Sequence, residues 1–400
     1  MVFVGKRCFK LHRIMLMIIG LWPYQKPFIW RIQSVFFFST YCCTLFFQLS
    51  TFVTMTCNMD CILKRFSYIC ICCVYILSYY AFYFNSEIVK QVRKTLQHIQ
   101  FDWKMFENSD IMNVFEEYLF EAYIFVFSAL IFVILSAIIF TIFECRSIIL
   151  DVIAPINESR PRKIEMDFEL FVDQEQYFVL YLVQEILGGF IGGWAILTAA
   201  TFLTTVMKHF CATYKIASYL IQNTVTVHTL HLPVAQRMQF MHRSICLSVY
   251  IHKRTLKFCK GLFFSFGLWY FPLLLICVLS LSCLLFRLYS ALMQFNDLRD
   301  IIMSCAILFS YFVYMLMANF LAQSYTEHSV GLLKSTYDTL WYVAPLQIQN
   351  LFLIMQKSIR SHKIVVGGLF VASIEGFSTV INVTSVLTCV LACVNIFNSS

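Results

Sequence analysis

Seven stretches of this chain are apolar over a length that crosses a lipid bilayer, and this feature constrains its fold more than any other. The hydrocarbon core of a bilayer is about 30 Å thick, which an α-helix crosses in about 20 residues. Backbone groups inside lipid must satisfy one another, so such stretches fold as helices. The seven predicted spans lie near 35–57, 66–84, 121–143, 178–207, 262–286, 301–321 and 367–396.

The composition excludes an ordinary water-soluble fold. Hydrophobic residues make up 60% of the chain and charged residues 13%, against about 45–50% and about 25% in soluble domains. Water-facing surfaces cannot hide that much apolar area, whereas lipid can contact it directly. We therefore predict an all-α, polytopic membrane protein in which residues 1–400 form a single seven-helix membrane domain.

Basic residues are concentrated in alternate loops and set the predicted orientation. The segment before the first span carries six basic residues and no acidic ones, and loop 208–261 carries eight and none. Loop 144–177 has a net charge of −4. Because lysine and arginine are enriched on the cytoplasmic side, we expect a cytoplasmic N-terminus and an extracellular C-terminus. The net charge of +8 is thus an orientation signal, and no nucleic-acid partner is expected.

The two longest loops on the predicted cytoplasmic side, 208–261 and 322–366, are expected to form a helical anchor. The first has few helix breakers, so we expect it to extend spans four and five, with a turn near Leu232-Pro233. In the second, Pro345 is a favourable first helical residue. The apolar face of the helix that follows is predicted to carry Ile348, Leu351, Phe352 and Met355. This helix lies either on the membrane or within a cytoplasmic bundle.

Motifs for catalysis and cofactor binding are absent from the sequence. It contains no GxSxG, HExxH or GxxxxGK[ST] pattern. The spacing of His228 and His231 suits two metal ligands, but no third ligand is near, which favours ordinary surface histidines. We expect no enzyme activity, no cofactor and no metal.

Two features near the predicted outer ends of the spans bear on chemistry outside the cell. Cys57, Cys61 and Cys145 lie there and either form a disulfide or stay free as small packing residues. Asn157 begins an Asn-Glu-Ser sequence, an acceptor pattern for glycosylation that also occurs often by chance.

Span four combines an acidic residue with two pairs of glycines. A carboxylate inside a membrane is costly, so Glu185 either lines a ligand cavity or accepts interhelical hydrogen bonds. Gly188-Gly189 and Gly192-Gly193 remove side chains from one stripe of the helix. The stripe either lets another helix approach closely or leaves room for a ligand.

Span seven carries a polar stripe. The residues recur every three or four positions and therefore share one helical face: Ser378, Asn382, Ser385, Cys389 and Cys393. A polar stripe on a membrane helix faces either another helix or water, so pore lining is one of the two interpretations.

The C-terminal third contains a series of specific motifs. Tyr337 is followed by Trp341-Tyr342, by the basic stretch QKSIRSHKIVVGGL, and by the run Ser373-Ile374-Glu375-Gly376-Phe377. With these spacings the chain resembles the insect odorant receptor family, as an odorant-specific subunit rather than the shared co-receptor. Elsewhere the chain is similar to this family in length, number of spans and predicted orientation.

The resemblance implies an odorant-gated, non-selective cation channel in the plasma membrane of olfactory neuron dendrites. Such subunits form heterotetramers with co-receptor subunits, and their partners are volatile odorants, permeant cations and membrane lipid. The odorant pocket is implied between spans two, three, four and six, in their outer halves. Its expected lining is Tyr68, Cys72, Tyr75, Ser136, Phe140, Tyr181, Glu185, Gly188, Ile307 and Tyr311.

The resemblance also implies that the last span lines the pore. Alignment on Phe377 places Val390 and Val394 at a hydrophobic constriction, one helical turn apart. A ring of apolar side chains can close a pore by dewetting. Asn382, Ser385 and Cys389 are expected on the same pore-lining helix.

Three other classes are alternatives. A G-protein-coupled chemoreceptor has the opposite orientation, and the sequence has neither a DRY-like triplet nor an NPxxY motif. A gustatory receptor would show a Thr-Tyr motif in its tail. A secondary transporter would show matched halves with broken helices, which this sequence lacks.

Overall fold

The structure is a computed structural model of the whole chain. The structure describes residues 4–54, 59–83, 86–107, 109, 111–153, 164, 166, 168–174, 176–294, 298–358 and 362–399. The described part is almost entirely helical, which confirms the all-α class.

Within the described residues, seven helices are long and apolar enough to cross a membrane, as predicted. They are α2 (Pro27–Thr54), α3 (Met59–Tyr83), α5 (Met112–Glu144), α7 (Phe178–Gln222), α9 (Val234–Gln294), α10 (Leu298–Tyr337) and α12 (Ile374–Ser399). The shorter elements are α1 (Val4–Ile18), α4 (Ser86–Phe106), α6 (Arg146–Ile153), α8 (Val227–Leu230), η1 (Trp341–Val343) and α11 (Leu346–Ser358). Strands β1 (Val365–Val366) and β2 (Phe370–Val371) pair antiparallel just before α12.

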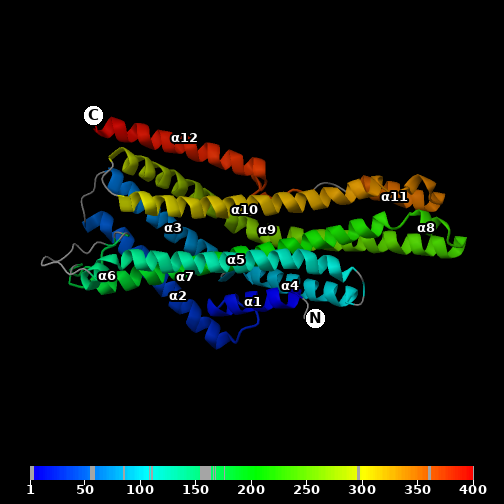
Figure 1. Cartoon of the computed structure of the whole chain (residues 1–400), viewed down its shortest axis with the longest axis horizontal. Coiled ribbons are helices and arrows are strands. Elements are labelled where there is room, and N and C mark those ends of the chain that lie inside the picture. Colours follow the sequence, from blue (N-terminus) through cyan, green and yellow to red (C-terminus); the bar gives the residue numbers. More distant parts are fainter. Residues whose placement is uncertain are drawn as a thin grey trace.

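Helices α7 and α9 are much longer than a bilayer is thick. They contain 45 and 61 residues, or about 68 and 92 Å at a rise of 1.5 Å per residue. Figure 1 shows them continuing, with α10, to the end of the molecule that carries α8 and α11. The chain turns back between them before Val234, so the expected helical extensions with a turn at Leu232-Pro233 are confirmed.

Helix α11 packs within this extended bundle. Ile348, Phe352 and Met355 are buried in a cluster with residues of α5, α7 and α9. Its apolar face is therefore covered by protein, which decides between the two placements expected from the sequence in favour of the bundle.

A buried ionic cluster fastens α4 to α7 and α9 in the same region. Asp102 Oδ2 lies 2.7 Å from His98 Nδ1 and 3.2 Å from His209 Nε2, and Arg254 Nη1 lies 3.2 Å from Asp102 Oδ1. Burial raises the pKa of Asp102, but hydrogen bonds from His209 and His98 outweigh that effect and lower it to about 2. The carboxylate is therefore charged at neutral pH.

The outer cysteines differ from one another. Cys61 is disulfide-bonded, whereas Cys145 is free. Cys57 and Asn157 lie outside the described residues.

Candidate ligand site

A small cavity lies among α2, α3 and α7, under the segment that leads into α7. Its volume is about 20 Å³, enough for one or two water molecules. It is lined by Tyr41, Thr44, Gln48, Tyr68, Ile71, Cys72, Tyr75, Met166, Phe168, Gln184, Glu185, Gly188 and Gly189. Such a mixture of aromatic and aliphatic surface with a few polar groups is typical of small-molecule sites.

The glycines of α7 shape the wall of this cavity. A Cβ at Gly188 would lie 3.5 Å from Thr44 Oγ1, an ordinary contact, whereas a Cβ at Gly192 would overlap the ring of Tyr75. Gly192 therefore lets Tyr75 lie directly on the helix backbone, and Gly188 leaves space beside it. The close approach of another helix, one of the two interpretations of the stripe, is therefore seen at Gly192, whereas Gly188 borders the cavity.

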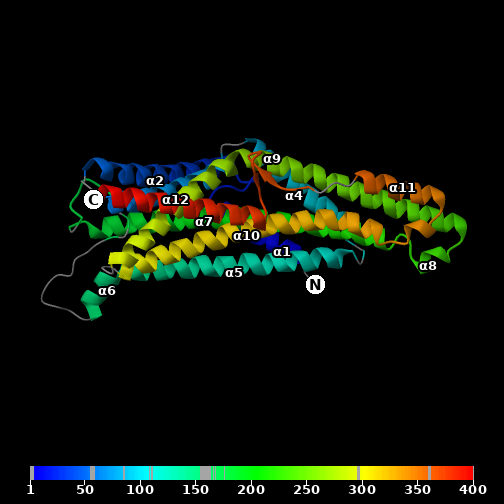
Figure 2. The same ribbon diagram turned by 90° about the horizontal axis from the view of Figure 1, so that it is seen from above.

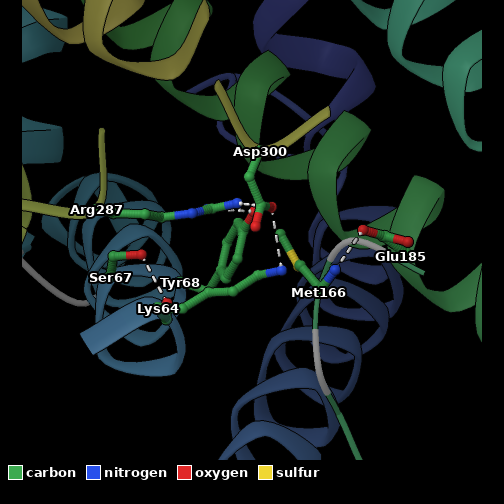
Figure 3. A network of polar contacts seen from close by, with 7 residues as sticks. All are labelled: Lys64, Ser67, Tyr68, Met166, Glu185, Arg287 and Asp300. Atoms are coloured by element: carbon green, nitrogen blue, oxygen red, sulfur yellow. Dashed lines mark hydrogen bonds and ion pairs between the residues drawn. The ribbon is translucent and has the colours of Figure 1, made fainter. Parts of the chain in front are cut away.

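Residues 164, 166 and 168–172 lie over the cavity. They are called here the cover segment, and hydrogen bonds attach them to α7. Glu185 Oε1 accepts a hydrogen bond of 3.0 Å from the backbone N–H of Met166 (Figure 3). Tyr181 Oη accepts one of 3.1 Å from Leu170 N–H and donates one of 3.0 Å to Val172 O. Glu185 thus both borders the cavity and holds its cover.

The cover segment is also attached to α2. The N–H of Glu169 donates a hydrogen bond of 3.1 Å to the carbonyl of Phe47. The ring of Phe168 stacks on Tyr181 with centroids 5.2 Å apart. Bonds to both α2 and α7 close the cavity on the side of the loop.

Tyr68 connects the cavity to α9 and α10. Its hydroxyl accepts a hydrogen bond of 2.9 Å from Arg287 Nη1, and Arg287 Nη2 lies 2.7 Å from Asp300 Oδ1. Lys64 Nζ lies 3.4 Å from the same carboxylate oxygen. Figure 3 shows Lys64, Tyr68 and Arg287 converging on Asp300. A displacement of the Tyr68 ring therefore acts directly on a charge network that joins three helices.

Helix α9 in turn carries α12. Cys283 and Phe286, within one turn of Arg287, pack against Leu391 and Ala392 of α12. Thr388 Oγ1 donates a hydrogen bond of 3.4 Å to the carbonyl of Ser282. A continuous set of contacts thus runs from the cavity through α9 to α12.

The structure gathers only part of the predicted ligand lining around this cavity. Tyr68, Cys72, Tyr75, Glu185 and Gly188 border it, and Tyr181 holds the cover segment. The remaining four, Ser136 and Phe140 on α5 and Ile307 and Tyr311 on α10, lie elsewhere. Ser136 is exposed, and the Tyr311 hydroxyl accepts a hydrogen bond of 3.3 Å from Ser280.

The contribution of α2 was not anticipated. Tyr41, Thr44 and Gln48 are spaced three and four residues apart and share one face of the helix. This polar stripe was the available signal, but aromatic residues crowd the same span and mask it. The cover segment has no periodicity and gave no signal.

The residues predicted for the pore lie on the open side of α12. This helix packs on α9 and α10 (Figure 2) through residues such as Phe377 and Val380. The predicted pore residues Asn382, Ser385, Cys389, Val390 and Val394 are all exposed, with Val390 at 53% and Val394 at 43%. A single chain therefore leaves the partly polar stripe of α12 uncovered.

One group of side chains in the described part of the chain has the spacing of metal ligands. The ligand atoms of His98, Asp102 and His209 lie within 4.8 Å of one another. The guanidinium of Arg254 already supplies a positive charge to Asp102. The cluster is therefore better described as an ion-pair network than as a cation site.

A protein-family model and solved structures with the same architecture match this chain. The family model described as 7tm Odorant receptor matches residues 58–385. The structure of the insect olfactory receptor OR5 from Machilis hrabei in complex with eugenol is similar with a TM-score of 0.78 at 13% identity, covering 97% of this chain and 98% of that one. A second structure of the insect olfactory receptor OR5 from Machilis hrabei is similar with a TM-score of 0.69 at 14% identity, covering 96% of this chain and 97% of that one. A search of curated proteins finds no match.

Proposed function

The chain belongs to the 7tm odorant receptor family, and from that premise we propose that it is a subunit of an odorant-gated cation channel. The observation that carries the proposal is the set of contacts from the cavity through Tyr68 and Arg287 to α12. A binding site and a transmembrane helix joined by packed side chains are what ligand gating requires.

The ligand is a volatile small molecule that occupies the cavity among α2, α3 and α7. The cavity volume of about 20 Å³ is too small for such a molecule, so binding requires the lining rings to move. A ligand that binds a widened conformation better than the closed one shifts the population toward it. Movement of Tyr68 would change its bond to Arg287 and thereby the position of α9 against α12.

Helix α12 lines the pore in an assembly with co-receptor subunits, which form a heterotetramer with this chain. The exposed stripe of α12 supports this, because an uncovered polar stripe on a membrane helix needs water or another subunit. The bundle of α7, α9 and α11 would anchor the subunits on the cytoplasmic side. The receptor would work in the plasma membrane of olfactory neuron dendrites.

The experiment that tests this function is whole-cell recording from cells that express the chain with and without the co-receptor. A panel of volatile odorants should evoke cation currents only when both subunits are present. Surface labelling establishes that each chain reaches the membrane. The absence of odorant-evoked current from a surface-expressed pair would contradict the proposal.

The orientation follows from the distribution of basic residues. Epitope tags at residue 1 and in the 150s, after α6 in the segment that joins α5 to α7, should lie on opposite sides of the membrane. In unpermeabilised cells, antibody should bind the loop tag alone, and permeabilisation should expose the N-terminal tag. An N-terminal tag that is accessible without permeabilisation would refute the cytoplasmic N-terminus.

The gate is proposed at Val390 and Val394. A polar side chain in an apolar constriction makes wetting easier, so Val390→Ser or Val394→Ser with the co-receptor should raise the current that flows without odorant. Because co-receptor subunits supply the other side chains of the ring, the effect should be partial. Val179→Ser, at an exposed valine of α7 and outside α12, is the control. Unchanged resting current, ion permeability and odorant sensitivity would exclude these valines from the gate.

A further inference from the structure

Two polar side chains of α2 are buried at the cavity without the hydrogen bonds that they need. Tyr41 is 1% exposed and Gln48 is 2% exposed. Within the described residues, neither the Tyr41 hydroxyl nor Gln48 Oε1 has a hydrogen-bond partner. Buried polar groups are almost always paired with protein or water, so both atoms indicate a partner that enters the cavity.

The neighbouring polar groups of the cavity differ in this respect. Gln184 Nε2 donates a hydrogen bond of 2.9 Å to Thr44 Oγ1, and the hydroxyl of Thr44 donates to the carbonyl of Thr40. The amide nitrogen of Gln48 is 3.6 Å from the sulfur of Met166, which leaves its oxygen as the group that needs a donor. The groups of the cavity that lack a partner are therefore one hydroxyl, on Tyr41, and one amide oxygen, on Gln48.

We infer that this cavity selects small, mainly apolar molecules that carry a hydroxyl group, an inference that rests on the proposed odorant-receptor function. A carboxamide oxygen such as Gln48 Oε1 only accepts hydrogen bonds, whereas the tyrosine hydroxyl of Tyr41 donates or accepts. Ethers, ketones and hydrocarbons have no proton to give to Gln48. A hydroxyl group can donate its proton to Gln48 or accept the proton of Tyr41.

The rest of the lining suits the apolar part of such a molecule. Ile71, Cys72, Phe168 and the ring of Tyr75 offer surface that gains from burial but discriminates weakly between hydrocarbon shapes. Organic acids are disfavoured, because a second carboxylate would lie near Glu185.

Matched sets of odorants test this inference on the receptor expressed with its co-receptor. The probes are hexanol, its isomer methyl pentyl ether and heptane, together with benzyl alcohol, its isomer anisole and ethylbenzene. Each unmade hydrogen bond to a buried group should cost about a factor of ten in affinity. We expect the concentration for half-maximal current to be about tenfold lower for the better alcohol than for its isomeric ether.

Two variants assign that preference to the two side chains. Gln48→Leu should remove the difference in affinity between alcohol and ether, because leucine has no oxygen to accept a hydrogen bond from the hydroxyl group of the alcohol. Tyr41→Phe should weaken alcohol and ether alike relative to the hydrocarbon. Ser39→Ala changes an exposed hydroxyl on the same helix and should leave all the ratios unchanged.

The outcomes separate this inference from the function on which it rests. Equal or better responses to ethers or hydrocarbons in a functioning receptor overturn the ligand class and leave the channel function intact. An alcohol preference that persists unchanged in surface-expressed Gln48→Leu also overturns it. If either variant fails to reach the surface, the odorant series on the parent receptor decides. A receptor that responds to no volatile in any wider panel refutes both.

Discussion

Replacing Gly192 by alanine will strongly weaken odorant-evoked current, although the change adds a single methyl group. A Cβ at this position overlaps the ring of Tyr75, a ring that lines the cavity. The backbone of α7 cannot move away easily, and the overlap includes Cγ, the ring atom bonded to the Cβ of Tyr75. The whole ring must therefore shift. Overpacking of this kind costs about 1–3 kcal/mol. If the displaced ring brings that whole cost to the ligand-binding conformation, the odorant concentration for half-maximal response rises by about 5- to 150-fold.

The next residue provides a matched control. A Cβ at Gly193 would meet nothing within 4 Å, and alanine is the better helix former by about 1 kcal/mol. Gly193→Ala should therefore respond like the parent receptor. Dose–response curves and surface labelling of both variants decide the matter. Similar sensitivity of the two variants would show that the close contact between Gly192 and Tyr75 does not shape the site.

Replacing Asp102 by alanine will prevent most of the receptor from reaching the cell surface. The change leaves the guanidinium of Arg254 without its carboxylate and removes the acceptor near His98 and His209. Breaking a buried ion pair on one side costs about 3–5 kcal/mol, a large part of the about 5–15 kcal/mol that stabilises typical proteins. The loss should appear in surface labelling and as a lower melting temperature of the purified receptor in detergent.

Asp338→Ala is the control for this prediction, because Asp338 is exposed near the end of the same helical bundle. It should leave surface expression near the parental amount. Asp102→Asn keeps the size of the side chain and an acceptor oxygen, so its loss should be smaller than that of Asp102→Ala. Parental expression and melting temperature of Asp102→Ala would show that the cluster does not stabilise the bundle.

The sequence predicted the helices well because their signals are local. Length and hydropathy located the seven spans, and the scarcity of breakers between 208 and 261 predicted that α7 and α9 extend beyond the membrane. The spacing of Ile348, Phe352 and Met355 predicted an apolar face on α11. The pattern did not show what this face packs against, since both lipid and a protein core can bury an apolar helical face.

The site was predicted in part because it depends on contacts between distant segments. Some of the predicted residues of α3 and α7 border the cavity, but Gln48 on α2 looks like any polar residue in a span. Asp102 and His209 are far apart in the chain, and no spacing rule relates two different helices. The role of Glu185 in holding the cover segment rests on a backbone N–H, which no side-chain pattern records.

The cover segment is fastened largely through its main chain, and this matters for how such receptors diversify. The N–H groups of Met166, Glu169 and Leu170 make the attachments to α7 and α2, and every amino acid except proline has such a group. Mutations can therefore change the side chains over the cavity while the segment stays in place. On the function proposed above, lineages of receptors can acquire new odorant preferences there by single substitutions, without passing through forms that have lost the closed site.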